Sequence, residues 1–418
     1  MALKAEQDRT QNNGHPGPAL GSPATTDARI SAADAEEIRR SARHAESAAR
    51  SYGLFGVFAL LIALAALLGV AFKLDEGRAS EDPGASASVE PPAPVGDYIE
   101  AITPAAAADS SEAKGIDFEP YKRVDPTLPA VPAGPVKRFR VDVYEHVTQV
   151  SADKAPTRVW GYGVNGSFYR GSGASPPLVV NQGDRVEITL VNGASERMNV
   201  QFPHSIDFHS SEVAPNEAFK TIQPGEKHTF SFTAKHPGVF MYHCATQPVL
   251  MHTGAGMVGM MVVKPRDLAP VDRELFVTQQ EFYIGEPGQD PSMAKMEAKN
   301  PDVIAFNGFG AQYQERPIEV KRGERVRMFV LNAGPSIWSA FHVIGTVFDT
   351  AVTDNGIAHD VQTVNLAPSQ GGYVEFTLDE EGAYPFVTHG FGDMVRGAVG
   401  VLATEHAPPP AAAGSDAH

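Results

Sequence analysis

An internal repeat constrains the fold of this 418-residue chain more than any other feature of its sequence. The stretch P-L-V-V-N-Q-G-D-R-V-E-I-T-L-V-N (177–192) is echoed 140 positions later by P-I-E-V-K-R-G-E-R-V-R-M-F-V-L-N (317–332). A second pair, F-T-A-K-H-P-G-V-F (232–240) and F-T-L-D-E-E-G-A-Y (376–384), follows in the same order. Short apolar or alternating runs between Gly, Pro, Asn and Asp are typical of β-strands. The repeat therefore predicts an all-β protein with two tandem β-sandwich domains, at 136–268 and 269–404.

The first 135 residues differ in composition from the repeat region. Residues 1–51 are polar and rich in Ala, Asp, Glu, Arg and Ser, so we expect them to be disordered. Residues 52–72 carry no charge, and these 21 positions, at about 1.5 Å each in a helix, can cross a hydrocarbon layer of about 30 Å. A cleaved signal peptide is the alternative, but the run is too long, lies too far from the N-terminus and lacks a small-residue cleavage site. Residues 73–135 predict a disordered linker rich in Ala, Pro and acidic residues, and 405–418 a low-complexity tail.

Charged residues flank the predicted transmembrane helix unequally. Arg39, Arg40, Arg43 and Arg50 precede it, whereas the basic residues after it are mixed with acidic ones. Because positively charged flanks stay on the cytoplasmic side, we expect a cytoplasmic N-terminus and membrane-anchored, extracytoplasmic β domains. The formal net charge of -16, without a basic stripe, argues against a nucleic-acid partner.

The only cysteine lies in the stretch Y-H-C-A-T-Q-P-V-L-M-H-T-G-A-G-M (242–257). Within it, Cys244, His252 and Met257 place a thiolate, an imidazole and a thioether in one short loop. Two histidines, one cysteine and a weak axial methionine are typical of a blue-copper electron-transfer site. The alternative is an ordinary buried thiol beside methionines that fill gaps in the core. The spacing favours copper, and a fourth ligand has to come from elsewhere in the chain.

The motif P-H-S-I-D-F-H (203–209) can supply that ligand and a second site. His204 and His209 are five residues apart, so in an extended strand their side chains point to opposite faces. His243 and Cys244 diverge for the same reason, because they are adjacent. If His204 faces inward with Cys244, His209 and His243 face a second metal site, which the peptide between residues 243 and 244 connects covalently to the first.

The second domain has no cysteine and therefore cannot hold a second blue-copper centre. It carries two candidate histidines, His342 in S-A-F-H-V-I-G-T-V-F-D and His389 in Y-P-F-V-T-H. The remaining histidines of the two domains are expected to be satisfied core or surface residues; these are His146, His228, His236 and His359.

Together, the motifs H-S-I-D-F-H, Y-H-C-x7-H-x4-M, S-A-F-H-V-I-G-T-V-F-D and Y-P-F-V-T-H resemble those of the two-domain cupredoxin, copper-containing nitrite reductases, over roughly 139–404. The shorter Cys-to-His loop resembles the class that includes the neisserial outer-membrane enzyme. The resemblance implies two cupredoxin-like Greek-key sandwiches and a homotrimer that reduces nitrite to nitric oxide. It also implies a small redox protein, a cupredoxin or a cytochrome c, as the electron donor.

The resemblance assigns roles to the candidate residues. It implies one type 1 and one type 2 copper per subunit. The type 1 ligands are His204, Cys244, His252 and Met257, and the type 2 ligands are His209, His243 and, from an adjacent subunit, His389. Asp207 and His342 match the catalytic aspartate and histidine, and Ile344 matches the isoleucine that lines the substrate pocket.

The sequence departs from the family pattern at three places. Ser205 stands where the family has an asparagine after the first ligand, 210–217 differs from a Gly- and Ala-rich loop, and Gly390 replaces a serine.

Two other functions remain as alternatives. A laccase-like multicopper oxidase would need paired H-x-H motifs, and this chain has none. A non-catalytic blue-copper electron-transfer protein would explain the Cys244 loop but not the remaining histidines taken together.

Overall fold

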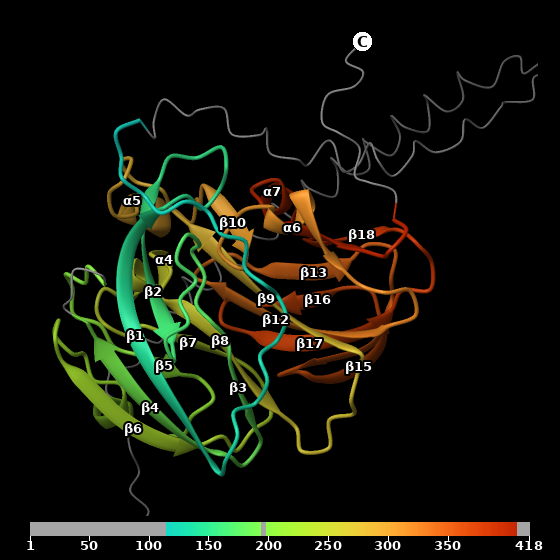
Figure 1. The fold of residues 1–418 in the computed structure, drawn as a ribbon, viewed down its shortest axis with the longest axis horizontal. Coiled ribbons are helices and arrows are strands. Elements are labelled where there is room, and N and C mark those ends of the chain that lie inside the picture. The colour runs from blue at the N-terminus through green and yellow to red at the C-terminus, as the bar shows by residue number, and fades with distance from the viewer. Residues whose placement is uncertain (1–113, 194–197, 408–418) are drawn as a thin grey trace, which may run out of the picture. The chain divides into compact units, whose positions relative to one another are not determined.

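The computed structural model describes residues 114–193 and 198–407. The predicted N-terminal segment, the predicted transmembrane helix, the linker up to residue 113 and the tail from residue 408 lie outside the described residues. Within the described ranges, no helix combines the length and the apolar character that a membrane crossing requires. The described residues form two β-sandwiches, drawn from blue-green to yellow-green and from yellow to red in Figure 1.

The first sandwich consists of two four-stranded sheets. One has the order β2 (Thr157–Val164), β1 (Val136–Thr148), β4 (Arg185–Asn192) and β6 (Lys227–Thr233). The other has the order β3 (Leu178–Asn181), β8 (Val258–Lys264), β7 (Gly238–His243) and β5 (Asp207–Phe208). Two short helices, α3 (Pro215–Ala218) and α4 (Val249–Gly254), lie in its connections.

The second sandwich consists of a six-stranded and a five-stranded sheet. The larger has the order β10 (Val303–Phe306), β9 (Arg273–Phe282), β12 (Arg325–Gly334), β17 (Gly371–Thr377), β14 (Phe348–Thr353) and β15 (Gly356–Val361). The smaller has the order β11 (Arg316–Glu319), β19 (Val399–Ala403), β18 (Ala383–Thr388), β13 (Ser339–Val343) and β16 (Val364–Leu366). Its short helices are α5 (Met293–Glu297), α6 (Gln312–Glu315) and α7 (Phe391–Met394).

The strand pairing reproduces the sequence repeat. In the first sandwich β3 runs parallel to β8, while β4 lies between a parallel β1 and an antiparallel β6. In the second sandwich β11 runs parallel to β19, while β12 lies between a parallel β9 and an antiparallel β17. The burial of β4 alternates along the strand, because Val186, Ile188 and Leu190 point into the core and the residues between them point outward. The all-β prediction is confirmed.

An apolar layer joins the two sandwiches. Side chains of β3, β7 and β8 contact those of β9 and β12 there, and the layer contains Val179, Val239, Met241, Val258, Met260, Val262, Phe276, Phe329 and Leu331. Burial of this much apolar surface fixes the sandwiches against each other. The histidines and the cysteine of the predicted sites therefore lie on a rigid scaffold.

The end of the predicted linker packs against the sandwiches instead of remaining a free tether. Val124 and Leu128 are buried in the layer between them. The reason is an open edge of β9. Strand β10 pairs only with residues 279–282 of β9, so the first half of β9 has no contact with β10. Residues 126–128 pair there, with Phe276 N–H donating to Pro126 O at 2.8 Å and Leu128 N–H donating to Glu274 O at 3.0 Å. The packed part of the chain thus begins before residue 136.

Candidate metal centres

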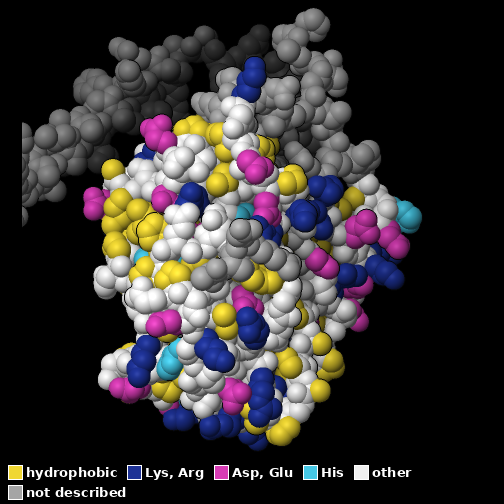
Figure 2. Space-filling view, turned by 60° about the vertical axis from the view of Figure 1, so that its left-hand side comes forward, with side chains coloured by type: hydrophobic (Ala, Val, Ile, Leu, Met, Phe, Trp, Pro, Cys, Tyr) yellow, Lys and Arg dark blue, Asp and Glu magenta, His cyan; other side chains and the backbone are white. Residues whose placement is uncertain are grey.

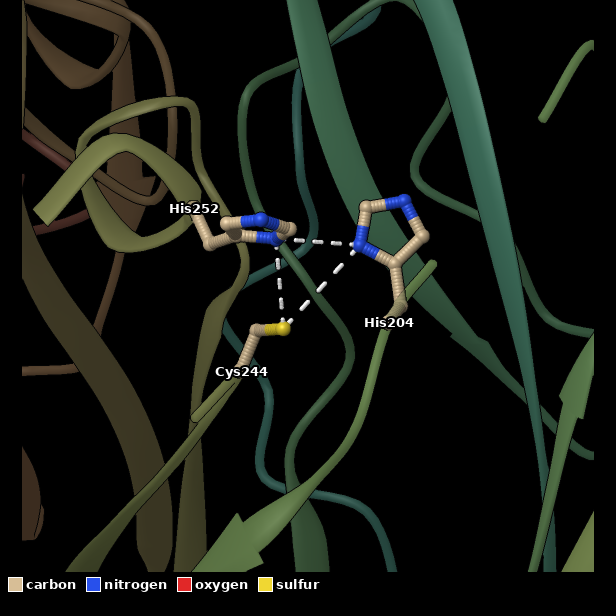
Figure 3. A group of neighbouring side chains, drawn as sticks. All are labelled: His204, Cys244 and His252. Atoms are coloured by element: carbon tan, nitrogen blue, oxygen red, sulfur yellow. Dashed lines mark hydrogen bonds between the residues drawn. The ribbon is translucent and has the colours of Figure 1, made fainter. Parts of the chain in front are cut away.

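Three predicted ligands meet inside the first sandwich (Figure 3). Cys244 Sγ lies 3.3 Å from His252 Nδ1 and 4.0 Å from His204 Nδ1, and the two Nδ1 atoms are 3.1 Å apart. All three side chains are buried. Because the three donor atoms point at one another in a water-poor interior, the group suits a single soft metal ion. We call it the Cys244 centre.

The loop after β7 brings these residues together. Cys244 directly follows the last residue of β7, and α4 carries His252 back over it. Gly256 has a φ of +110°, which allows the chain to turn next to Trp160 O, an atom that would lie 2.9 Å from an added Cβ. Met257 N–H then donates to His252 O at 3.1 Å, and Cys244 N–H donates to Met257 O at 3.1 Å. The fully buried Met257 side chain therefore starts beside the cysteine.

A buried carboxylate selects the tautomer of His204. Glu145 on β1 is 1% exposed, and its Oε1 lies 3.3 Å from His204 Nε2. A carboxylate oxygen accepts hydrogen bonds, so Nε2 carries the proton and Nδ1 keeps its lone pair for a metal. Glu145 is not among the site residues predicted from the sequence. A signal existed, because Glu145 follows the buried Val141 and Val143 at a spacing of two along β1, which puts it on their face.

The surroundings of Cys244 favour the ionised form of its thiol. Burial alone would raise its pKa, but the adjacent imidazoles of His204 and His252 hold the pKa well below the usual range. The backbone N–H of Ser205, which lies 3.4 Å from Sγ, also donates to the sulfur. Thiolates are the form in which cysteines bind metals, so the environment supports a metal thiolate.

A second cluster lies where β5 pairs with β7. Asp207 is opposite His243 in the register, and His209 Nε2 lies 3.1 Å from His243 Nε2. His243 Nδ1 donates to Cys244 O at 2.9 Å, so its Nε2 is left unprotonated and faces the other imidazole. Asp207 Oδ2 lies 3.9 Å from the same Nε2. This group, which we call the His243 half-site, suits a cation on the surface of the first sandwich.

His342 and His389 meet on the second sandwich. Their rings are stacked with centroids 5.1 Å apart, and His389 N–H donates to Ala340 O at 2.8 Å. His342 Nδ1 donates to Gln362 O, which leaves Nε2 as the free ring nitrogen. Burial lowers the pKa of His342. We call this pair the His389 half-site, and Ile344, 38% exposed, lies two residues from His342 along the chain.

The predicted site residues are thus brought together in part. Among the described residues, no group of donors within 4.8 Å combines His389 with His209 and His243. Within one chain, the His243 half-site contains Asp207 and two imidazoles, and the third predicted ligand belongs to the other half-site.

A family model described as "Multicopper oxidase" matches residues 146–268. A copper-containing nitrite reductase of Neisseria meningitidis is 38% identical over 242 residues, which are 55% of this chain and 61% of the relative. A copper-containing nitrite reductase of Cereibacter sphaeroides is 30% identical over 331 residues, which are 70% of this chain and 85% of the relative. The chain thus spans less than two thirds of the length of the neisserial relative and most of the length of the second.

Among solved structures, a copper nitrite reductase from Nitrosomonas europaea superimposes with a TM-score of 0.59 at 27% identity. The match covers 67% of this chain and 98% of that chain. The structure of a multicopper oxidase matches with a TM-score of 0.55 at 22% identity, which reflects the shared fold alone.

Proposed function

Because this chain belongs to the copper-containing nitrite reductases, we propose that it reduces nitrite to nitric oxide. Each nitrite takes up one electron and two protons and releases one water. The observation that carries the proposal is the adjacency of His243 and Cys244, whose side chains enter two different donor clusters. An electron received at the buried cluster has a short covalent path to the exposed one through that single peptide.

The cofactor is copper, and the two donor sets would hold copper ions with different roles. The type 1 ligands are His204, Cys244, His252 and Met257, and the type 2 ligands are His209, His243 and His389. When bound, copper would exchange single electrons at the first set and hold a nitrite oxygen as a Lewis acid at the second. The chosen tautomers of His204 and His243 already present unprotonated nitrogens for this purpose.

Asp207 and His342 are the residues we assign to proton transfer. Asp207 lies 3.9 Å from His243 Nε2, so a nitrite bound at the half-site lies within its reach. His342 Nδ1 is committed to Gln362 O, so the proton that moves is the one on Nε2. Because burial lowers the pKa of His342, its imidazolium is a stronger acid than that of an ordinary histidine and gives up that proton as the pH rises toward neutral. Ile344 would line the nitrite pocket between Asp207 and His342.

We propose that the two half-sites meet between neighbouring copies in a homotrimer. His389 is exposed and lies apart from the His243 half-site of its own chain, so a third imidazole has to come from another subunit. The surroundings of the His389 half-site support this, because Trp338, Phe391 and Val395 are 63%, 58% and 62% exposed. Large apolar side chains at such exposure favour cover by a partner surface.

The electron donor would dock over His252. A hollow of about 370 Å³ lies there, bordered by Trp160, Phe202, Pro248 and Met251 as well as His252. Mostly apolar hollows of this kind suit transient contact with a small redox protein, a cupredoxin or a cytochrome c. On the face shown in Figure 2, acidic, basic and apolar side chains are interspersed, so no extended basic surface for nucleic acid appears there.

We further propose that a helix at residues 52–72 anchors the protein in the membrane, with both sandwiches outside the cytoplasm. The supporting observations are the uncharged run itself and the arginines that precede it. Fractionation of cells, followed by protease treatment of intact spheroplasts, tests this. Removal of both sandwiches by the protease is expected, and full protection would contradict the orientation.

One experiment tests the proposed activity. The full chain is loaded with copper in detergent, and metal content, visible absorption and nitric oxide release from nitrite are measured with a reduced donor. We expect two coppers per chain, blue colour and turnover. One copper without turnover would favour a non-catalytic blue-copper protein, and oxygen consumption without nitrite turnover would favour an oxidase.

The variant His389→Ala separates the two copper sites. Turnover should be lost while the blue colour remains, because His389 does not belong to the Cys244 centre. His236→Ala is the matched control, since this histidine is exposed and, among the described residues, pairs with Glu212 alone. Loss of blue colour in His389→Ala would mean that the sites are misassigned.

A further inference from the structure

Ser205, the residue that replaces the family's asparagine, contacts the sulfur of the Cys244 centre twice. Its backbone N–H lies 3.4 Å from Cys244 Sγ, and its hydroxyl oxygen lies 3.8 Å from the same atom. Ser205 is fully buried, so water does not compete for either contact. Tyr162 O–H donates to the Ser205 carbonyl at 2.6 Å and holds the residue in place.

The hydrogen bonds around the Ser205 hydroxyl determine where its proton points. The oxygen accepts from Ala245 N–H at 3.0 Å and from the Thr246 hydroxyl at 3.1 Å. A hydroxyl has two acceptor positions and one proton. With both acceptor positions occupied, the Ser205 proton remains for the one further partner that the structure gives this oxygen, Cys244 Sγ.

The hydrogen bonds continue from Ser205 toward the surface. The hydroxyl oxygens of Thr221 and Thr246 are 3.0 Å apart, and the proton of Thr246 is already committed to Ser205. Thr221 therefore donates to Thr246. Three hydroxyls from three separate segments of the first sandwich thus donate in one direction, from the exposed Thr221 to the buried sulfur. Chains of hydrogen bonds aligned in this way polarise one another.

We propose that this hydroxyl chain of Thr221, Thr246 and Ser205 raises the reduction potential of the type 1 copper bound at Cys244. The inference rests on the proposed function, because it assumes that copper binds there. Hydrogen bonds to the cysteine sulfur are one of the factors that tune the potential of blue-copper sites. A hydrogen bond donated to the thiolate withdraws electron density from its sulfur. The thiolate then stabilises oxidised copper less strongly, so the reduced state is favoured. Serine and threonine together would thus replace the family's asparagine next to the ligand.

The experiment measures the midpoint potential of the copper-loaded full chain by spectroelectrochemistry in the absence of nitrite. Ser205→Ala removes the hydroxyl donor to sulfur and keeps the backbone N–H. We expect the ratio of reduced to oxidised centre at a fixed poise to fall about threefold, which is ~28 mV at 59 mV per tenfold change. Thr246→Val removes the hydroxyl that donates to Ser205, and we expect a smaller shift in the same direction. The sulfur-to-copper absorption band should move in both variants.

Two further variants serve as controls. Thr246→Ser retains the hydroxyl and should restore the wild-type potential. Thr253→Val is the matched control, because within the described part of the chain the Thr253 hydroxyl donates only to carbonyls of its own helix α4, Val249 O and Leu250 O. Potentials of Ser205→Ala and Thr246→Val equal to that of Thr253→Val would overturn the inference while leaving nitrite turnover intact. A wild-type protein that binds copper without blue colour would instead overturn the proposed function and the inference with it.

Discussion

Replacing Glu145 by alanine should weaken both the fold and the copper site, because one carboxylate oxygen serves three donors. Glu145 Oε1 lies 3.3 Å from His204 Nε2 and accepts from Gln201 N–H at 3.0 Å and from Phe202 N–H at 3.3 Å. The glutamate side chain is fully buried, so alanine leaves the three donors without an acceptor in a region of little water.

The size of the effect follows from these contacts. A buried donor that loses its acceptor costs about 1–3 kcal/mol, and since two of the three contacts are long we expect a loss of about 3 kcal/mol in unfolding free energy. Glu145→Gln keeps an acceptor oxygen and should lose about 1 kcal/mol. In Glu145→Ala the tautomer of His204 is no longer fixed, and the loss of such outer contacts typically lowers metal affinity about 10- to 100-fold.

Urea unfolding of the copper-free chain, followed by tryptophan fluorescence, gives the first quantity, and copper competition with a chelator gives the second. Glu187→Ala is the control, because Glu187 lies on the surface of β4 in an exposed pair with Arg138 and should change stability by less than about 1 kcal/mol. If Glu145→Ala matches Glu187→Ala in both measurements, the assignment of Glu145 as the residue that positions His204 is wrong.

Three further predictions concern the thiolate, the subunit contact and a buried histidine. Cys244→Ser should abolish the blue absorption and leave one copper per chain, measured by metal analysis; two retained coppers would contradict the ligand assignment. Phe391→Asp places a charge on the exposed face beside His389, so sedimentation should show smaller assemblies and nitrite turnover should fall. Assemblies of unchanged size would exclude this face from the proposed contact between subunits. Burial lowers the pKa of His146 to about 4, below its usual value near 6.5, so the unfolded state binds the proton first and stability should fall by about 3 kcal/mol as pH drops from 6.5 to 4. His146→Gln should flatten that slope in pH-dependent urea unfolding, and an equal slope in both proteins would contradict the role of His146.

Local spacing explains why much of the Cys244 centre could be predicted. Cys244, His252 and Met257 lie in one loop, and the backbone bonds that close it, from Cys244 to Met257 and from Met257 to His252, join residues within that loop. His204 and His209 are five residues apart, so the period of two along a strand predicts opposite faces, and the structure places these two histidines in different clusters.

Contacts between distant segments could not be read in the same way. Glu145 reaches His204 across 59 residues, and the hydroxyl chain joins Thr221, Ser205 and Thr246 from separate loops. The packing of Val124 and Leu128 depends on a gap in the cover of β9, which composition alone does not reveal. Each of these contacts depends on how sheets stack, and strand patterns do not specify stacking.

Strand period, internal repeat and ligand spacing can be read along the chain, so they were sufficient to predict the two-sandwich fold, the Cys244 loop and the identity of the candidate histidines. Which of these side chains meet depends on the folded arrangement. It placed His209 with His243 and His342 with His389, and within one chain it kept the two pairs in separate donor groups. The physical reason is that each sandwich orients its own histidines through its own strand register, while contact between the half-sites depends on surfaces that a single chain leaves exposed.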